Sequence, residues 1–540
     1  MIYVTALEFK KKLSMELFWL VAGLITHEKA TLVEGGMSAI FAKVLNHWVN
    51  SSYGILNKAG FSLEIDGAHY LVRFALHAFV ADEAALRSVL QSKGASGMKP
   101  CAKCYNVISK FHGGTWDIHG DECIIDVTCA TYQNFLQFTD QQIFDVQRQL
   151  QETYESGTAS ELKRQEQICG FLHSPKGLLA DPLLRDVLPP SKCHYDFLHT
   201  LFSNGIVCDE ICLFWKRVCA ETNLTTEDLQ QFCKEGGFTL KQSIGEYKLN
   251  KVFDAKYLDK STYGGDAGYA VLALFLLETF ATNLLDSVVS LKRHIACLTK
   301  LCWVCRWYFR LKSGKCKGII APSARMFPLF SEHLVLFQSV YGRSLVRPKH
   351  HFNFHCAESM DIQEAVLDCW TLERKHRIYK NTAQNFPMND SFESSMLGKL
   401  LMTQEEQLSD MDQDPSCTPY AHDQDLANQL GCQTAWLSRS MRFNEQTFHK
   451  DDICLFTHDV RKAGRVICCV AAEWSGSSQR FLMLELLVRS DSVSADLDPW
   501  HLSQWQPSVS RSLVNLATHA EQLLWPFFWW SKSQRIIVSC

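Results

Sequence analysis

Hydrophobic positions in the first part of the chain change from helical to strand-like spacing. Residues 36–50 repeat apolar side chains at helical intervals, which predicts an amphipathic helix. The runs 60–67 and 69–82 are rich in β-branched and aromatic residues, and Asp66-Gly67 between them predicts a hairpin turn. The second run ends at Asp82, directly before a helical pattern. The end of a buried strand is where α/β enzymes present catalytic groups.

Farther along, the pattern is mostly helical and then strand-like again. Residues 136–345 read as helices, and the apolar run 268–285 contains Glu278, which favours a buried helix over a membrane span. The shorter run Leu17 to Ile25 predicts a buried strand or helix rather than a signal anchor. Residues 401–447 are polar and acidic and predict a linker. Short strands in 448–540 predict a small β-barrel or sandwich.

Composition narrows the class of protein. The 540 residues are 47% hydrophobic and 21% charged, with a net charge of −4, so no global basic field marks a nucleic-acid binder. Any contact with a polyanion must therefore come from local patches. The 22 cysteines are dispersed along a long chain, which predicts a reducing intracellular environment.

Two cysteines and two histidines have the spacing of zinc ligands. Cys101 and Cys104 share a glycine-rich loop, and His351 and His355 lie one helical turn apart on one face. Together they predict a Cys2His2 zinc site that joins the two ends of a long insertion. The alternatives are spare thiols with satisfied histidines, or a ligand replaced by one of two neighbours, His350 or Cys356.

A second pair with the same spacing predicts packing instead. Cys302 and Cys305 lie within an aromatic helical pattern that has no loop, so we expect them in the core.

Two carboxylates flank this predicted zinc site. Phosphoryl transfer on DNA commonly uses divalent ions held by acidic residues, and Mg²⁺ or Mn²⁺ prefers such oxygen ligands. Asp82 and Glu373 each lie close in sequence to one half of the zinc site, so the zinc would bring them together. Glu83 is a possible substitute for Asp82. Taken singly, each acid is better explained as a solvated or ion-paired surface carboxylate.

Basic residues near these motifs are candidates for phosphate contacts. Some of them lie in the aromatic-rich helical pattern of residues 292–317. The alternative explanation for that pattern is a helix with one buried aromatic face and one solvated basic face. The DNA-contact candidates are Arg374, Lys375, Arg377, Arg306 and Arg310.

The order and spacing of these motifs resemble the DDE/D transposases of eukaryotic cut-and-paste elements. The similar groups are the CACTA/Mirage/Chapaev, Kyakuja/Dileera/Zisupton and Plavaka-type elements, and transposase-like proteins of dinoflagellate genomes. Cys101 follows Asp82 by 19 residues, Leu198-His199 supplies the insertion motif after Asp196, and His355 precedes Glu373 by 18 residues. The resemblance covers about residues 30–400.

The resemblance implies an α/β chain with a ribonuclease H-like core interrupted by a large α-helical insertion. The core would comprise 1–135 and 346–400, with the insertion at 136–345, the linker at 401–447 and the β-rich domain at 448–540. It further implies structural Zn²⁺, catalytic Mg²⁺ or Mn²⁺, DNA as partner, a homodimer, no membrane and a nuclear location. Asp196 and His199 form a motif of uncertain role.

One departure bears on activity. The family carries its first catalytic aspartate well upstream of the second, whereas Asp66 here lies in a predicted turn and Glu28 and Glu34 are of the wrong type. We expect the chain to begin after the first core strand, so strand transfer should be impaired. The alternatives are a non-catalytic zinc-containing DNA- or chromatin-binding protein and an unrelated helical scaffold.

Overall fold

The computed structural model describes the chain except for a set of short segments. These are 8, 10–12, 14–15, 52–53, 110–123, 236–237, 240–248, 313–320, 385, 388, 390, 410–416, 444–445, 451, 458–460, 476, 490–501, 516–527, 533–534 and 540. The fold is mixed α/β, as predicted, and forms two compact units. The first comprises Met1–Asn223 with Lys256–Gln404, and the second comprises Leu224–Ala255 with Glu405–Cys540.

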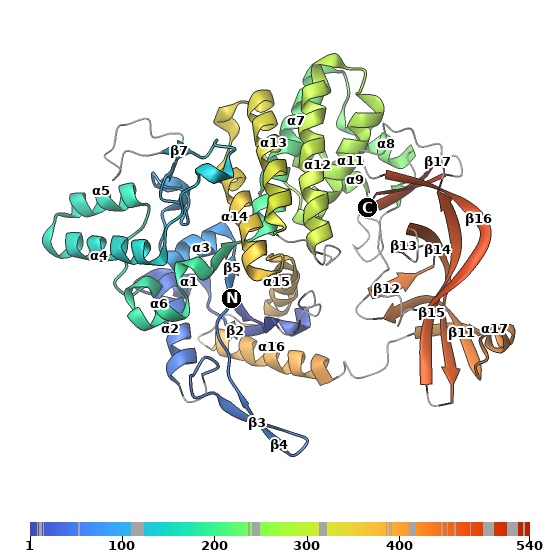
Figure 1. Cartoon of the computed structure of the whole chain (residues 1–540), viewed down its shortest axis with the longest axis horizontal. Helices are drawn as coiled ribbons and strands as arrows, with labels where there is room; N and C mark the ends of the chain where they lie inside the picture. The colour runs from blue at the N-terminus through green and yellow to red at the C-terminus, as the bar shows by residue number, and fades with distance from the viewer. Residues whose placement is uncertain are drawn as a thin grey trace. The chain divides into compact units, whose positions relative to one another are not determined.

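The first unit is mainly helical (Figure 1). Its helices are α1 (His27–Thr31), α2 (Gly36–Asn50), α3 (Glu83–Leu90), α4 (Asp140–Ser156), α5 (Ala159–Cys169), α6 (Pro182–Val187), α7 (Ile206–Glu221), α10 (Ala255–Leu258), α11 (Ala267–Leu284), α12 (Lys292–Lys312), α13 (Ser323–Tyr341), α14 (Pro348–Gln363), α15 (Trp370–Ala383) and α16 (Phe392–Ser409).

The described strands of this unit form four separate pairs. Two pairs are antiparallel: β1 (Ile2–Val4) with β2 (Leu20–Gly23), and β3 (Phe61–Ile65) with β4 (Ala68–Val72). Two are parallel: β5 (Phe79–Ala81) with β8 (Cys193–Tyr195), and β6 (Val107–Ile108) with β7 (Ile125–Asp126). The N-terminal strands therefore do not extend the β5–β8 pair.

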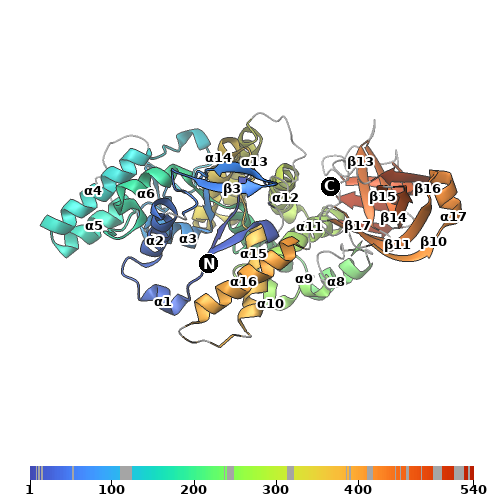
Figure 2. The same cartoon turned by 90° about the horizontal axis from the view of Figure 1, so that it is seen from below.

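The N-terminal strand β2 packs on the helices that follow the insertion. Val21 lies in a buried apolar cluster with Tyr379 of α15 and Met396 of α16. These two helices lie side by side in both views (Figures 1 and 2). The predicted buried element at Leu17 to Ile25 is thus a strand beside the helix that carries Glu373.

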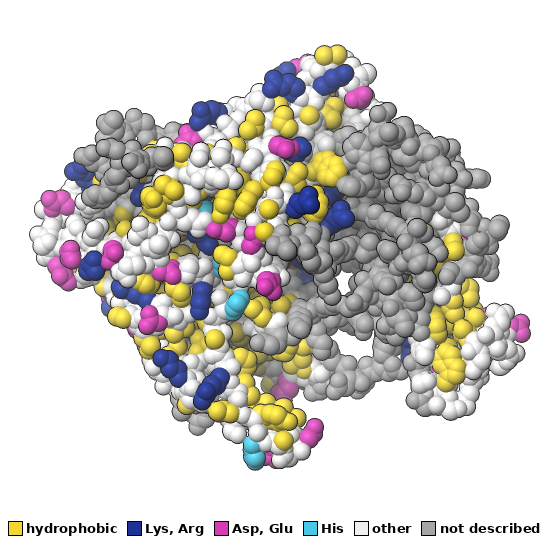
Figure 3. Space-filling view, in the orientation of Figure 1, with side chains coloured by type: hydrophobic (Ala, Val, Ile, Leu, Met, Phe, Trp, Pro, Cys, Tyr) yellow, Lys and Arg dark blue, Asp and Glu magenta, His cyan; other side chains and the backbone are white. Residues whose placement is uncertain are grey.

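The predicted hairpin at Asp66-Gly67 is confirmed. Both residues have positive φ, 51° and 78°, as a two-residue turn between twisted strands requires. The strands are largely exposed, and apolar side chains gather where the hairpin projects (Figure 3). They include Leu63, Tyr70 and Leu71.

Strand β8 lies within residues 136–345, which the sequence predicts to be a mostly helical insertion. It pairs with β5 in parallel, with Phe79 opposite Cys193 and Ala81 opposite Tyr195. All three β8 residues are buried, and a strand of three residues is too short for an alternating pattern to reveal it. One strand of the β5–β8 pair therefore comes from within the predicted insertion.

The helices α7, α11, α12 and α13 pack against one another (Figure 1). Helix α11 is long and apolar enough to span a membrane by length and composition, and 67% of its apolar window is buried inside the protein. Cys302 and Cys305 are fully buried in α12, as predicted.

The second unit is built on one sheet. Its strand order is β10-β11-β14-β15-β16-β18-β17-β9, and β12 and β13 pair with β11 and β14. The strands are β9 (Phe238–Thr239), β10 (Cys417–His422), β11 (Thr434–Phe443), β12 (Gln446–His449), β13 (Ile453–Thr457), β14 (Arg461–Trp474), β15 (Ser477–Arg489), β16 (Leu502–Asn515), β17 (Phe528–Lys532) and β18 (Arg535–Ser539). The helices are α8 (Thr226–Glu235), α9 (Leu249–Val252) and α17 (Gln424–Leu430).

Alternate residues of β14 face two apolar clusters. Cys469 packs with Leu482 and Leu484, whereas Val470 packs with Leu426 of α17. A strand covered on both faces explains the unbroken apolar run of residues 466–472. The range 401–447 is not a simple linker, because α16 extends into it and β10, α17 and β11 lie within it.

Candidate functional site

The four predicted zinc ligands come together in the core of the first unit. Their ligand atoms all lie within 4.8 Å of one another. His355 Nε2 is 3.4 Å from Cys101 Sγ, 3.2 Å from Cys104 Sγ and 3.1 Å from His351 Nε2. All four side chains are buried. This Cys2His2 cluster is therefore a possible metal-binding site of the zinc type.

Local structure explains why these side chains converge. Helix α14 begins with Pro348, whose missing N–H suits the first turn, and it places His351 and His355 on one face. In the CxxC loop, the Lys103 backbone N–H donates to Cys101 Sγ at 3.3 Å. Such N–H···S contacts favour the thiolate form that a metal requires.

A carboxylate that is not one of the four ligands holds His355 in place. Glu358 Oε2 lies 3.2 Å from His355 Nδ1 and so fixes the ring with Nε2 toward the thiols. Burial would raise the pKa of the Glu358 carboxyl, but its contacts with His355 lower it to about 2. Sequence reasoning missed Glu358, although its i+3 spacing from His355 on a helix is a usable signal.

The two alternative ligands do not join the cluster. His350 Nδ1 contacts the backbone of Arg347, and its ring faces Phe337. Cys356 Sγ donates to the Tyr195 carbonyl at 3.5 Å and contacts Thr200 Oγ1 at 3.6 Å. Both side chains therefore point away from Cys101.

Tyr195 links the Cys2His2 cluster to the acidic residues. Its hydroxyl accepts from the Ala102 backbone N–H at 3.3 Å and lies 3.9 Å from Cys101 Sγ, and its ring stacks on Phe352 of α14. Tyr195 ends β8, and Asp196 follows it. The position of β8 is thus set by the CxxC loop and by α14 together.

Asp82 and Asp196 follow the paired ends of two parallel strands. Ala81 is opposite Tyr195, so the next residue of each chain lies at the same edge. Asp82 caps α3, because its Oδ1 accepts from the Ala85 backbone N–H at 2.6 Å. Asp196 is 1% exposed and accepts from His199.

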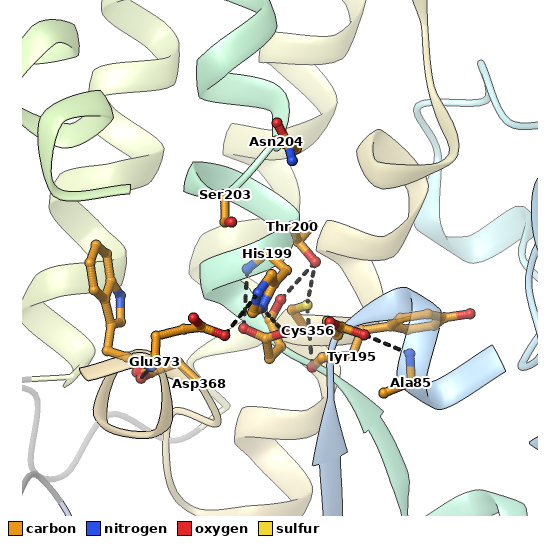
Figure 4. Close-up of polar contacts among 12 residues, drawn as sticks. Ala85, Tyr195, His199, Thr200, Ser203, Asn204, Cys356, Asp368 and Glu373 are labelled. Atoms are coloured by element: carbon orange, nitrogen blue, oxygen red, sulfur yellow. Dashed lines mark hydrogen bonds and ion pairs between the residues drawn. The ribbon is translucent and has the colours of Figure 1, made fainter. Parts of the chain in front are cut away.

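His199 connects Asp196 to Glu373, and its contact with Glu373 is drawn in Figure 4. Its Nδ1 is 2.9 Å from Asp196 Oδ2, and its Nε2 is 3.6 Å from Glu373 Oε1. Burial opposes the charge on His199, but these two carboxylates outweigh burial and raise its pKa to about 10, with Asp82 contributing. His199 is therefore an imidazolium at neutral pH. We call Asp82, Asp196, His199 and Glu373 the acidic cluster.

Glu373 lies in the first turn of α15 and is partly exposed. Hydrogen bonds with His199 and then His376 hold the pKa of this carboxyl far below its usual range. Glu83, the proposed substitute for Asp82, lies near Lys349 and other cations. Burial raises its pKa against the influence of Lys349 and other cations.

Two of the five candidate DNA contacts are buried, and three lie at the surface. The prediction for Arg306 is wrong, because its guanidinium is 7% exposed and donates to both oxygens of buried Glu278. Lys375 is also buried, and its ammonium donates to the carbonyls of Glu16 and Trp19. Arg374 pairs with Glu16 at the surface. The remaining two candidates, Arg310 and Arg377, are exposed.

Comparison of the chain with protein-family models, curated proteins and solved structures gave no match.

Proposed function

We propose that the chain is a transposase-derived DNA-binding protein of the DDE/D class with impaired strand transfer. One observation carries the proposal. The Cys2His2 cluster joins segments 251 residues apart. Tyr195, whose hydroxyl contacts Cys101, directly precedes Asp196 in the acidic cluster, which also includes Asp82 and Glu373. A ribonuclease H-like core, with β5 and β8 as neighbouring parallel strands, fits this arrangement. A nuclear location, homodimerisation and action on transposon ends or chromatin follow from the same proposal.

Zinc is the ion that the Cys2His2 cluster fits. Bonds of about 2.3 Å to sulfur and 2.0 Å to nitrogen place tetrahedral ligand atoms about 3.3–3.8 Å apart. The distances from His355 Nε2 to His351 Nε2 and to the two thiol sulfurs, 3.1–3.4 Å, are close to that range. Two thiolates and two neutral imidazoles balance the charge of Zn²⁺.

The contacts within the acidic cluster argue against cleavage. Bound Mg²⁺ or Mn²⁺ would activate water and polarise the scissile phosphate, held by Asp82 and Glu373. The His199 imidazolium, however, already neutralises Glu373, and Asp196 is buried and committed to His199. Asp82, whose Oδ1 caps α3, is then the carboxylate of this cluster that remains for the ions. This arrangement favours the second candidate function, a non-catalytic DNA- or chromatin-binding protein.

Binding of the full chain to fluorescent duplex DNA tests the proposal. We expect the affinity to fall as salt rises, with a slope of about 0.9 per phosphate contact. Arg377→Gln should reduce that slope by about one contact. Arg148→Gln, which changes a 64% exposed side chain on α4, is the matched control. Absence of binding at low salt would refute the proposal.

Nicking of supercoiled plasmid separates the two candidate functions. With Mn²⁺, an active copy would nick DNA and lose that activity in Asp82→Asn and Glu373→Gln. We expect binding without nicking. Nicking that both substitutions leave intact would place the chemistry elsewhere.

A further inference from the structure

A second group of metal-ligating side chains lies among the helices of the first unit, apart from the residues discussed so far. Glu210 of α7, Cys297 of α12 and His333 of α13 are 0%, 0% and 2% exposed. One ligand atom from each lies within 4.8 Å of the other two. Three helices thus bring a carboxylate, a thiol and an imidazole together at one buried place.

Contacts within the protein leave one carboxylate oxygen of this group without an N–H or O–H donor. His333 Nε2 lies 2.6 Å from Glu210 Oε2, which forms one buried contact between imidazole and carboxylate. The other oxygen, Glu210 Oε1, is buried without an N–H or O–H donor, and the Cys297 thiol, a weak donor, is the further side chain that interacts with this carboxylate. A carboxylate oxygen left unpaired in the core costs free energy that a cation would recover.

A further buried polar group belongs to α13, the helix that carries His333. The hydroxyl of Tyr341, at the end of α13, is buried without a hydrogen-bond partner. Burial, followed by the charges of Glu210 and Cys297, holds the pKa of this phenol far above its usual range. Glu210 Oε1 and Tyr341 Oη are thus two buried oxygens of this helical core without an N–H or O–H donor.

We propose that Glu210, Cys297 and His333 bind a second Zn²⁺ ion that fastens α7, α12 and α13 together. Oxygen, sulfur and imidazole nitrogen form a donor set that suits zinc and excludes Mg²⁺. On binding, the Cys297 S–H bond breaks, its proton leaves to solvent and a Zn–S bond forms. The carboxylate and the thiolate then balance the charge of the ion, and a water molecule supplies the fourth ligand.

Metal content of the full chain tests this inference, which does not depend on DNA binding. Protein purified without chelators should contain about two equivalents of zinc by elemental analysis. Cys297→Ala should lose about one equivalent and keep the ion of the Cys2His2 cluster. Cys302→Ala, at another fully buried cysteine on the same helix, should keep both. A wild-type content of one equivalent that Cys297→Ala leaves unchanged would overturn the inference.

A measurement on the wild-type protein alone guards against variants that fail to fold. X-ray absorption at the zinc edge reports the mean number of sulfur ligands per ion. Two sites with three thiolates between them give about 1.5 sulfurs, whereas the Cys2His2 cluster alone gives about 2. A value of 2 would overturn the proposal, and a value near 1.5 would support it.

Discussion

At the residue scale, Glu358 should control how tightly the Cys2His2 cluster holds its ion. Its carboxylate orients His355 and accepts from Gln137 Nε2 at 2.6 Å. Loss of such an outer partner typically weakens metal binding 10- to 100-fold. We expect Glu358→Ala to lower zinc affinity by about that factor in competition with a chromophoric chelator. Glu152→Ala, at a 67% exposed position, should leave the affinity unchanged, and an equal loss there would contradict the role given to Glu358.

His194 should make the folded protein sensitive to acid. It is fully buried in β8, and burial followed by the nearby Lys103 ammonium lowers its pKa from 6.5 to about 3. Because the folded-state pKa is depressed, the neutral imidazole contributes stability above pH 6.5. That contribution is lost as the pH falls toward 3.

A denaturation series can measure this effect. Between pH 7.5 and 5, the free energy of unfolding should fall about 2 kcal/mol less in His194→Gln than in the wild-type chain. Urea titration at both pH values gives this difference. His47→Gln, at an exposed position on α2, should follow the wild-type curve. Parallel losses in the His194 variant and the wild type would show that His194 is not the sensitive group.

Sequence reasoning succeeded for residues whose chemistry sets their spacing. A CxxC loop and two histidines one turn apart have few uses other than metal binding, and the structure brings all four together. It failed for Arg306, because nothing in the pattern of α12 showed that the arginine faces Glu278 of α11 rather than solvent. The group of Glu210, Cys297 and His333 was missed for a similar reason, since three helices far apart in sequence supply one ligand each.

At the element scale, the β3–β4 hairpin and α2 should differ in their contribution to stability. Leu71 on the hairpin is 61% exposed, whereas Leu45 on α2 is fully buried. We expect Leu71→Lys to change the free energy of unfolding by less than about 0.5 kcal/mol. Leu45→Ala removes buried methyl groups and should cost about 2–5 kcal/mol. Comparable costs in urea denaturation would mean that the hairpin packs against something in solution.

Elements with a clear local signal were predicted, and those fixed by distant partners were not. The hairpin turn, α2 and the buried helix α11 follow from turn residues and periodicity. Strand β8 has three residues and depends on β5, more than a hundred residues earlier, so no local pattern indicates it. In the same way, β10 and β11 lie in a polar region; β11 pairs with the distant apolar strand β14, and β10 then pairs with β11.

At the scale of the whole molecule, the predicted succession of five parts becomes two discontinuous units. Residues 224–255, predicted within the insertion, belong to the unit of the C-terminal sheet, where β9 pairs with β17. Pairing between strands almost three hundred residues apart leaves no trace in composition or periodicity. Sequence patterns therefore predicted many local elements, while the grouping of elements depended on long-range contacts.

Removal of metal should affect the two units differently. The Cys2His2 cluster closes a loop of 251 residues within the first unit, and closing a loop of that length removes chain entropy worth about 5 kcal/mol from the unfolded state. No candidate metal group lies among the described residues of the second unit. A strong zinc chelator should therefore lower the Tm of the first unit by roughly 5–10 °C and leave the second unit unchanged.

Calorimetry combined with hydrogen exchange can assign this change to its source. After chelation, exchange should speed up in the CxxC loop, in α14 and in β8, because Tyr195 connects the strand to Cys101. Strands β14 and β15 of the second unit are the internal control. Cys101→Ser should reproduce the faster exchange without chelator, since it removes one ligand of the same ion. Equal acceleration in both units would mean that the chelator acts on general stability, and the ion would then not be the element that holds the distant segments together.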